Sequence, residues 1–258
     1  YFGRDDWAAV APGLKTIEDA TRIRGRILLA FEHADRELDP QRRAELLTFA
    51  IIGAGPTGVE LAGALAEIAH HTLRHDFRHI EASDARIYLI DALPRVLAAY
   101  PPDLSAKAQG SLQRLGVQVI TGAIVTEVMA EEVVLRVGDG TRSIRAGTLL
   151  WAAGVAASPL GVLLAKGAGA ATDRAGRILV ECDFSLPQRP EVFVVGDLAS
   201  WQHGRSVPLP GIAPVAMQAG EHAARCIAAR AAGRPVPPPF QYQDRGSLAT
   251  IGRAAAVG

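Results

Sequence analysis

The stretch FAIIGAGPTGVELAG, residues 49–63, decides the fold class of this protein. A hydrophobic run, Phe49–Ile52, leads into Gly-x-Gly-x-x-Gly and then directly into a segment with helical periodicity. Continuous apolar runs of this kind are typical of buried parallel strands. A strand, a glycine turn and a helix in this order predict a βαβ unit whose turn holds the pyrophosphate of a dinucleotide.

The three glycines of the motif, Gly53, Gly55 and Gly58, answer three needs: a tight turn, a close approach of the backbone to the pyrophosphate, and close packing of helix on strand. Pro56 and Thr57 lie at the start of the helix, where N–H groups and the helix dipole receive phosphate. We therefore assign these five residues to cofactor binding. The alternative is a glycine turn that binds nothing.

An acid follows the second expected strand, RIYLI, at Asp91. Its carboxylate is placed to accept the two hydroxyls of an adenosine ribose, and no arginine follows at once to receive a 2′-phosphate. The pattern favours NADH over NADPH, and Arg95 is the residue that could overturn this preference. The interval from Gly58 to Asp91 exceeds the usual ~20 residues, so we expect the helix from Pro56 to be extended by residues 70–84.

The remaining pattern completes one nucleotide-binding domain and begins another. Residues 16–36 predict an amphipathic helix, and short strands around GDG, residues 138–140, predict an antiparallel ribbon. VFVVGD, residues 192–197, predicts a buried parallel strand with Asp197 at its tip, where ligands of doubly wound sheets bind. The alternative is that Asp197 caps a following helix. A helix is expected over residues 215–232.

Composition excludes several classes of protein. The 258 residues are 49% apolar and 21% charged, as in ordinary globular proteins, and 27 basic against 27 acidic residues argue against a nucleic-acid surface. Cys182 and Cys226 form no Cys-x-x-Cys, which argues against a redox dithiol or a zinc site. The histidines of residues 70–79 fit a solvated helix face better than a metal pair, and we expect no metal. No apolar run is long enough to span a membrane.

Three further residues are candidates, and Glu60 has two open interpretations. Glu60 lies in the first turn of the helix, where it either stabilises the helix dipole or faces the nicotinamide end of the cofactor. Gly154 belongs to WAAGVAASPL, residues 151–160, whose small side chains allow the chain to cross close over a nucleotide. Gln218 is the polar residue of interest in the stretch GIAPVAMQAGEHAA, residues 211–224, which begins the later helix.

These motifs together resemble the type II NADH:quinone dehydrogenases, which are flavoproteins with two dinucleotide-binding domains. The stretches that carry the resemblance are GAGPTGVELAGALAEIA, HTLRHDFRHI, IDALPRVL, LLWAAGVAASPL, VFVVGDLAS, APVAMQAG and GSLATIGR. The resemblance implies an α/β fold: a Rossmann-like NADH-binding domain with a β-meander, inserted into a partial FAD-binding domain. It assigns residues 1–45 and 158–258 to the FAD domain and residues 46–157 to the NADH domain.

The resemblance also implies roles for single residues. The glycine turn and Asp91 would bind NADH, with Gly154 near the nicotinamide and Glu60 near both nicotinamide and flavin. Gly196 and Asp197 would bind FAD, with Asp197 at its ribityl chain, and the helix from Ala213 would approach the isoalloxazine. Gln218 would lie on the quinone side. Arg245 stands where the family often has lysine. Glu60, Gln218 and Arg245 are the expected catalytic residues.

The function implied is hydride transfer from NADH to FAD and then electron transfer to a membrane quinone. The implied partners are NADH and quinone, with peripheral attachment to the cytoplasmic face of a bacterial inner membrane; a homodimer stays an open alternative. Because the family's FAD glycine loop would precede Tyr1 and its anchoring helices would follow Gly258, we expect this fragment to be soluble and inactive alone. The alternatives are a soluble ferredoxin-type reductase of the same superfamily and an NADH-binding module without activity.

Overall fold

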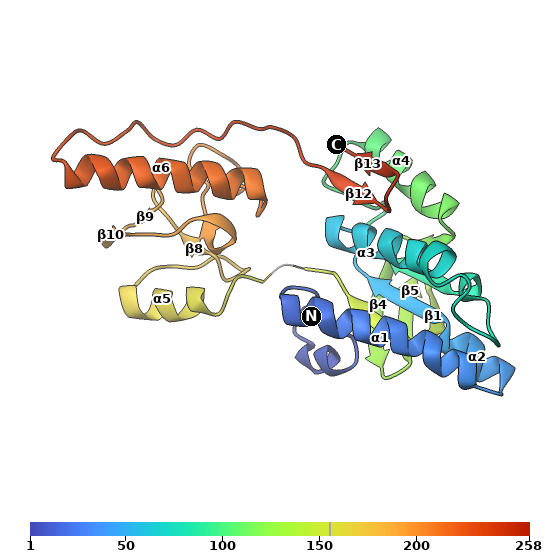
Figure 1. Ribbon diagram of the computed structural model, residues 1–258. Helices are drawn as coiled ribbons and strands as arrows, with labels where there is room; N and C mark the ends of the chain where they lie inside the picture. Colours follow the sequence, from blue (N-terminus) through green and yellow to red (C-terminus); the bar gives the residue numbers. More distant parts are fainter. Residues whose placement is uncertain (155) are drawn as a thin grey trace. The chain divides into compact units, whose positions relative to one another are not determined.

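The computed structural model describes residues 1–154 and 156–258, so that Val155, in the small-residue stretch noted above, lies outside the described residues (Figure 1). The chain forms two compact units. One consists of Tyr1–Gly154 with Ser247–Gly258, and the other of Val155–Gly246. The α/β fold class is confirmed. The first unit contains the segment 1–45, and the assignment of that segment to an FAD domain stays a prediction.

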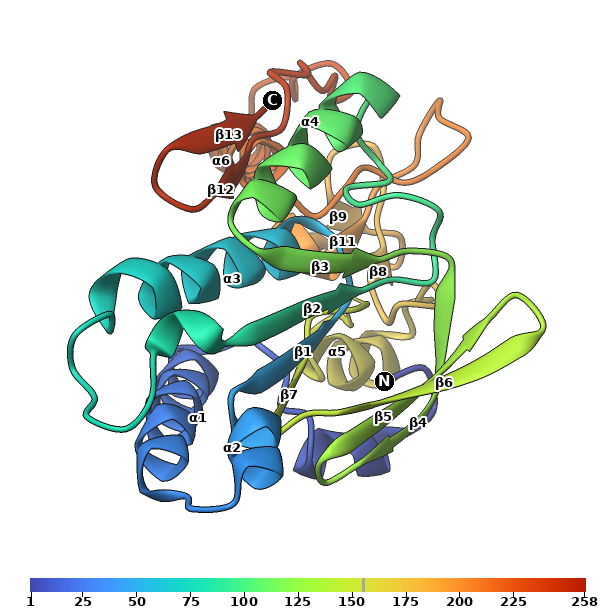
Figure 2. The same cartoon turned by 90° about the vertical axis from the view of Figure 1, so that its right-hand side faces the viewer.

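A parallel sheet forms the centre of the first unit (Figure 2). Its strands lie in the order β3-β2-β1-β7, all pairs being parallel. The bounds are β1 Thr48–Ile52, β2 Arg86–Ile90, β3 Val117–Ile120 and β7 Thr148–Trp151. Every residue of β1 is buried, as its uninterrupted apolar sequence predicts. The glycine motif therefore follows a central strand at its carboxyl end.

Side chains alternate between two cores on the two faces of this sheet. Phe49 and Ile51 pack in one core with residues of the helices, and Ala50 and Ile52 pack in the other with residues of the antiparallel ribbon. The helices are α1 Ile17–Arg36, α2 Pro40–Leu46, α3 Pro56–Glu67 and α4 Pro102–Arg114. The ribbon consists of β4 Ala123–Met129, β5 Glu132–Val137 and β6 Gly140–Arg145, with the expected hairpin between β5 and β6.

Local sequence explains where the first helix begins. Thr16 accepts a hydrogen bond from the backbone of Asp19, whose side chain in turn accepts one from the backbone of Thr16. This capping box starts α1 at the residue after Thr16. The buried face of the helix then reaches the sheet, where the rings of Phe31 and Phe49 lie 5.4 Å apart. The preceding short helix, η1, spans Asp5–Ala9.

The expected extension of the helix through residues 70–84 is wrong beyond Thr72. The helix ends at Glu67, and a π-helical turn, η2 Ile68–Thr72, and a 3₁₀ turn, η3 Ala82–Asp84, are the helical parts that follow it. The segment between them is held by α1 instead, because Asp35 accepts hydrogen bonds from the backbone N–H groups of Arg78 and His79. These tertiary contacts satisfy N–H groups that a longer helix would have satisfied internally.

A C-terminal hairpin packs on α3 where the sequence predicted a single strand. It consists of β12 Ala249–Ile251 and β13 Ala255–Val257. The approach is close enough that a Cβ built at Gly63 would lie 2.6 Å from the backbone nitrogen of Gly252. Glu67 accepts a hydrogen bond of 2.5 Å from the backbone of Arg253. The hairpin is therefore an integral part of the first unit.

The second unit has a small core of aromatic rings beneath a long helix. Its elements are α5 Leu160–Ala168, β8 Ile178–Leu179, β9 Ser185–Leu186, β10 Arg189–Phe193, η4 Gly196–Leu198, β11 Ala199–Ser200 and α6 Ala213–Ala231. The rings of Phe184 and Phe240 lie 4.9 Å apart and those of Trp201 and Phe240 lie 5.5 Å apart. Among the described residues, no helix of either unit is long and apolar enough to cross a bilayer.

The expectation for VFVVGD is corrected by this unit. The strand β10 ends at Phe193 and pairs antiparallel with β9, so Asp197 does not stand at the tip of a parallel strand. Asp197 lies in the 3₁₀ turn η4 instead. The two valines before Gly196 predict a strand because β-branched residues favour strands. In the structure they follow the last paired residue of β10.

Candidate functional site

The glycine turn is fixed by contacts that leave no space for side chains at two of its three glycines. Gly53 has φ +106°, and a Cβ there would lie 2.5 Å from the backbone nitrogen of Ala153. A Cβ at Gly58 would lie 1.7 Å from the carbonyl oxygen of Gly53. Both distances are far inside van der Waals contact. The turn and the packing of α3 therefore require glycine at both positions.

Gly55 is different, because nothing lies within 4 Å of a Cβ built on it. It has φ −71°, which any residue can adopt, and it immediately precedes α3. The fold itself places no requirement on this glycine. Open space beside a glycine at the start of a helix without side-chain capping is what close approach of a phosphate needs. Pro56 and Thr57 form the first turn of that helix, as predicted.

Asp91 joins the end of β2 to the glycine turn. One carboxylate oxygen accepts a hydrogen bond of 2.5 Å from the backbone of Ala54, and the other accepts one of 2.8 Å from Leu93. A carboxylate has about four acceptor positions, so two remain for ribose hydroxyls. The residue expected to bind the cofactor thus also shapes the turn that receives it.

Arg95 lies within its own loop. Its Nη2 donates to the carbonyl oxygens of Ala98 at 2.8 Å and Tyr100 at 3.3 Å, and its Nε is buried without a partner among the described residues. The guanidinium is therefore committed to the loop that follows Asp91. This placement supports the expected preference for NADH, because a 2′-phosphate would need this group to leave those carbonyls.

Glu60 contacts the C-terminal hairpin. Its Oε1 accepts a hydrogen bond of 3.3 Å from the backbone of Thr250. The sequence did not single out Tyr100, which is 9% exposed and close to this acid. Burial first, and then the Glu60 carboxylate, raise the pKa of the Tyr100 phenol. The sequence holds no signal that Tyr100 lies near Glu60, since forty residues separate the two positions.

Gly154 lies beyond the carboxyl end of β7 with φ +72°, a conformation that favours glycine. A Cβ there would lie 3.3 Å from the ring of Phe2. The nearby indole of Trp151 donates a 2.7 Å hydrogen bond to the carbonyl oxygen of Ala153 and packs against Tyr1, with ring centroids 4.9 Å apart. Its expected place near the nicotinamide stays a prediction.

The predicted FAD residues belong to the second unit. Gly196 has φ +69°, and the Asp197 carboxylate lies against Gly211, where a Cβ would be 3.2 Å from Oδ1. Ala213 begins α6, whose N-terminus has no side-chain cap. These residues come together within the unit, around the start of that helix. Their role in FAD binding stays a prediction.

Gln218 and Arg245 are placed in different ways. The Gln218 amide donates to the carbonyl oxygen of Gln243 and accepts from the N–H of the same residue, both at 3.0 Å. Gln218 thus ties α6 to the extended segment after it. Arg245 is exposed on that segment, in the second unit. No group of three His, Cys, Asp or Glu side chains within residues 1–154 and 156–258 could hold a metal ion.

The geometry of the first unit is that of a dinucleotide-binding domain, and comparison with known families agrees. The profile of the pyridine nucleotide-disulphide oxidoreductases matches residues 9–220. The chain belongs to this family. The matched residues include the glycine turn and all four strands of the β3-β2-β1-β7 sheet.

Relatives within this pyridine nucleotide-disulphide oxidoreductase family carry a more specific name. The chain is 48% identical over 260 residues to a type II NADH:quinone oxidoreductase, Ndh, of Mycobacterium tuberculosis, covering 100% of this chain and 55% of that protein. It is 28% identical over 260 residues to a type II NADH:quinone oxidoreductase of Staphylococcus haemolyticus, covering 100% of this chain and 62% of the relative. The chain thus spans little more than half the length of these curated relatives.

Solved structures share the fold. NDH2 of Plasmodium falciparum, solved in complex with NADH, aligns with a TM-score of 0.86 at 16% identity, covering 99% of this chain and 66% of that one. The reduced CoADR-RHD of Bacillus anthracis aligns with a TM-score of 0.67 at 20% identity, covering 95% of this chain and 38% of that one. At these identities the likeness concerns the fold alone.

Proposed function

We propose that this protein forms part of a flavoprotein that oxidises NADH and reduces a quinone. The observation that carries the proposal is the 48% identity, over the whole chain, to a relative named as a type II NADH:quinone oxidoreductase. The glycine turn supports it independently, because Gly55 keeps open a space that the fold does not need.

The proposed NADH half consists of the glycine turn, α3 and Asp91. Backbone N–H groups at the start of α3 would bind the pyrophosphate, and the Asp91 carboxylate would accept the ribose hydroxyls. When bound, the nicotinamide supplies a hydride, and the flavin accepts it and passes electrons onward. Gly154 and Glu60 would lie toward the reacting end. The work of the chain is to bind and orient the cofactor.

The proposed FAD half uses residues of the second unit. Asp197 would bind the ribityl chain, and the uncapped start of α6 at Ala213 would direct N–H groups toward an electron-rich ring. Gln218 and Arg245 would face the quinone. Residues 1–45 and 158–258 would belong to the FAD domain, and residues 46–157 to the NADH domain.

The wider setting is also part of the proposal. A quinone is a membrane substrate, so the enzyme would attach peripherally to a membrane, at the cytoplasmic face in a bacterium, and homodimers would form there. Flotation of the protein with lipid vesicles, and its mass by light scattering, test these two points. Protein that stays with the soluble fraction in the presence of vesicles would contradict attachment by this chain.

The central test uses NADH oxidation by the longer flavoprotein that contains this chain, supplied with FAD. We expect NADH to quench its tryptophan fluorescence saturably, and NADH oxidation to depend on a water-soluble quinone. A variant Gly55→Ala should lose the quenching and the activity together. Turnover with a ferredoxin but not with quinone would overturn the quinone assignment. Saturable NADH binding without turnover by the longer protein would identify the chain as a binding module.

A further inference from the structure

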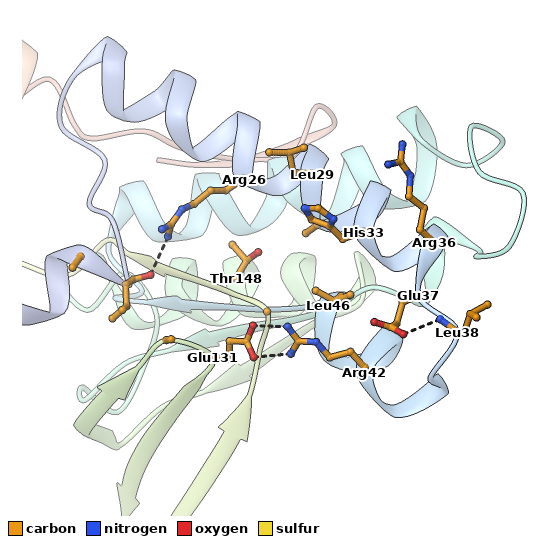
Figure 3. Close-up of a pocket in the computed structure, with 15 residues that line it drawn as sticks. Arg26, Leu29, His33, Arg36, Glu37, Leu38, Arg42, Leu46, Glu131 and Thr148 are labelled. Carbon is orange, nitrogen blue, oxygen red and sulfur yellow. Dashed lines mark hydrogen bonds and ion pairs between the residues drawn. The ribbon is translucent and has the colours of Figure 1, made fainter.

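A cavity lies at the opposite end of the strands from the glycine turn. It has a volume of about 890 Å³ and is lined by α1, α2, the ribbon and the first residue of β7 (Figure 3). Leu46, directly before β1, and Thr148, which begins β7, mark its position at the amino ends of these strands. The glycine turn begins after Ile52, about 15 Å further along β1 at ~3.3 Å per residue. The cavity is therefore separate from the candidate NADH site.

One arginine in this cavity lacks an acidic partner. Arg26 is half-buried, and its Nη1 donates a 3.0 Å hydrogen bond to the carbonyl oxygen of Val10. No carboxylate of the described residues lies within ion-pairing distance of its guanidinium. The other two arginines of the lining are paired, Arg36 with Glu32 and Arg42 with Glu131. A half-buried cation with unused N–H donors is costly unless an anion meets it.

The acids of the lining are already committed. Glu131 accepts two hydrogen bonds from the Arg42 guanidinium, at 2.6 and 2.5 Å. Glu37 accepts from the backbone N–H groups of Leu38 and Asp39. Neither carboxylate therefore neutralises Arg26. The end of the cavity at Arg26 keeps an uncompensated positive charge.

A hydroxyl belongs to the same lining as Arg26. Thr148 is 4% exposed, and its side chain makes no hydrogen bond with another described residue. Figure 3 shows Thr148 on the side of the sheet that faces α1, the helix that carries Arg26. A guanidinium with a neighbouring hydroxyl donor suits the oxygen atoms of a carboxylate.

Apolar residues form part of the lining beside Arg26, and the other end of the cavity carries the charged side chains of Arg36, Glu37 and Arg42. Leu29 is 55% exposed, and it lies on α1 with Ala30, opposite Leu46 of α2. His33 follows one turn later on the same helix and lies in the middle of the cavity (Figure 3). An exposed apolar floor next to a lone cation complements a ligand with an apolar chain and an anionic head.

The geometry points to a binding site for a small amphiphilic anion, a single apolar chain with a carboxylate head. The carboxylate meets the Arg26 guanidinium and the Thr148 hydroxyl, and the chain lies over Leu29, Ala30 and Leu46. The site is independent of the proposed NADH and quinone chemistry, because none of these residues belongs to the glycine turn.

The test is calorimetric titration of the protein with decanoate, well below the concentration at which it forms micelles. Butyrate carries the same head without the chain, and decyl maltoside carries the chain without the charge. We expect decanoate to bind saturably with one site per chain and at least tenfold more tightly than either. Equal affinity for decyl maltoside would overturn the anion assignment, and the absence of saturable decanoate binding would overturn the site.

Matched variants localise the binding. Arg26→Gln and Thr148→Val should each weaken decanoate binding, Arg26→Gln by about tenfold, whereas Arg24→Gln, an exposed arginine of the same helix outside the cavity, should not. Leu29→Glu should abolish binding by placing a like charge under the chain. Leu28→Glu, at a 40% exposed position outside the lining, is its control. If Arg26→Gln fails to fold, Thr148→Val tests the site independently. Equal losses of decanoate binding in the control variants would refute the assignment.

Discussion

At the scale of single residues, the glycine turn separates what the fold needs from what a ligand needs. A Cβ at Gly58 would overlap the carbonyl oxygen of Gly53 at 1.7 Å, whereas a Cβ at Gly55 would meet nothing within 4 Å. We expect Gly58→Ala to lower the free energy of unfolding by about 1–3 kcal/mol or more. Gly55→Ala should change it by less than about 1 kcal/mol while weakening NADH binding.

Urea unfolding and NADH titration of the two variants measure these effects separately. Gly167→Ala, at a helix position where nothing lies within 4 Å of the added carbon, controls for the loss of a glycine alone. If Gly55→Ala bound NADH as the wild type does, the pyrophosphate would have to lie elsewhere.

Asp91 combines a structural contact with the proposed contact to the ribose. Its carboxylate accepts hydrogen bonds from the backbones of Ala54 and Leu93 and has capacity for two more. Asp91→Asn keeps one acceptor oxygen but removes the charge. We expect the ratio of NADPH to NADH dissociation constants to fall by about tenfold, since repulsion of a 2′-phosphate is lost.

The measurement is the pair of dissociation constants in the wild type and in the variant. Asp103→Asn, at an exposed acid of α4, is the control. An unchanged ratio in Asp91→Asn would remove Asp91 from the ribose site and leave it with its structural role.

At the scale of elements, α2 is joined to the ribbon by a network of ion pairs. Arg42 pairs with Glu131 and Glu45, and Arg145 pairs with Glu45 at 3.0 Å. The hydrogen bonds from Arg42 hold the pKa of Glu131 below its usual 4.5. Because this pKa is lower in the folded protein, the stabilisation is present above about pH 4.5 and is lost as the pH falls through the folded pKa.

Glu131→Gln tests this pH dependence. Half of the Glu131 side chain is exposed, so we expect a loss of about 0.2–1 kcal/mol at neutral pH, and less at high salt. The difference from the wild type should shrink in urea unfolding experiments as the pH falls below about 4.5 and through the lowered pKa of Glu131. Asp139→Asn, at the exposed turn of the same ribbon, should show no such loss. A difference that stays constant with pH would show that the charge of Glu131 is not its cause.

At the scale of the whole molecule, the two compact units have separate tryptophan reporters. Trp7 and Trp151 lie in the first unit and Trp201 in the second. Ligands that bind only the native state stabilise the part that holds them. We expect NADH to raise the unfolding temperature reported by Trp7 and Trp151 in the variant Trp201→Phe.

The converse variant, in which Trp7 and Trp151 are replaced by phenylalanine, reports on the second unit. In this variant, NADH should raise the unfolding temperature by less. Equal shifts from both sets of reporters would show that the chain unfolds as one cooperative body, and the unit structure would have no thermodynamic counterpart.

Sequence patterns predicted the elements whose contacts are local. The strand β1, the glycine turn and the start of α3 follow from continuous apolar residues and from the spacing of Gly53, Gly55 and Gly58. The end of α3 did not, because residues 70–84 have helical composition but are held by Asp35 of α1. The antiparallel pairing of β10 was missed for a similar reason, since an apolar run contains no signal of its partner.

The candidate site shows the same division. Asp91 was predictable as the acid after a strand, and its place beside the glycine turn followed. The contact between Glu60 and Thr250 depends on a hairpin 190 positions away, for which the sequence near Glu60 holds no signal. Arg26 was unremarkable in the sequence, and only the folded structure shows that it is half-buried without an acidic partner among the described residues.

The unequal demands on the three glycines also bear on how such chains diverge. Substitution at Gly53 or Gly58 is removed by selection for folding alone, whatever the protein binds. Substitution at Gly55 is visible only to selection for the cofactor. A related protein that has lost nucleotide binding but kept the fold would therefore be expected to differ at this one glycine of the three. A survey of related genes could identify such proteins by the residue at this position.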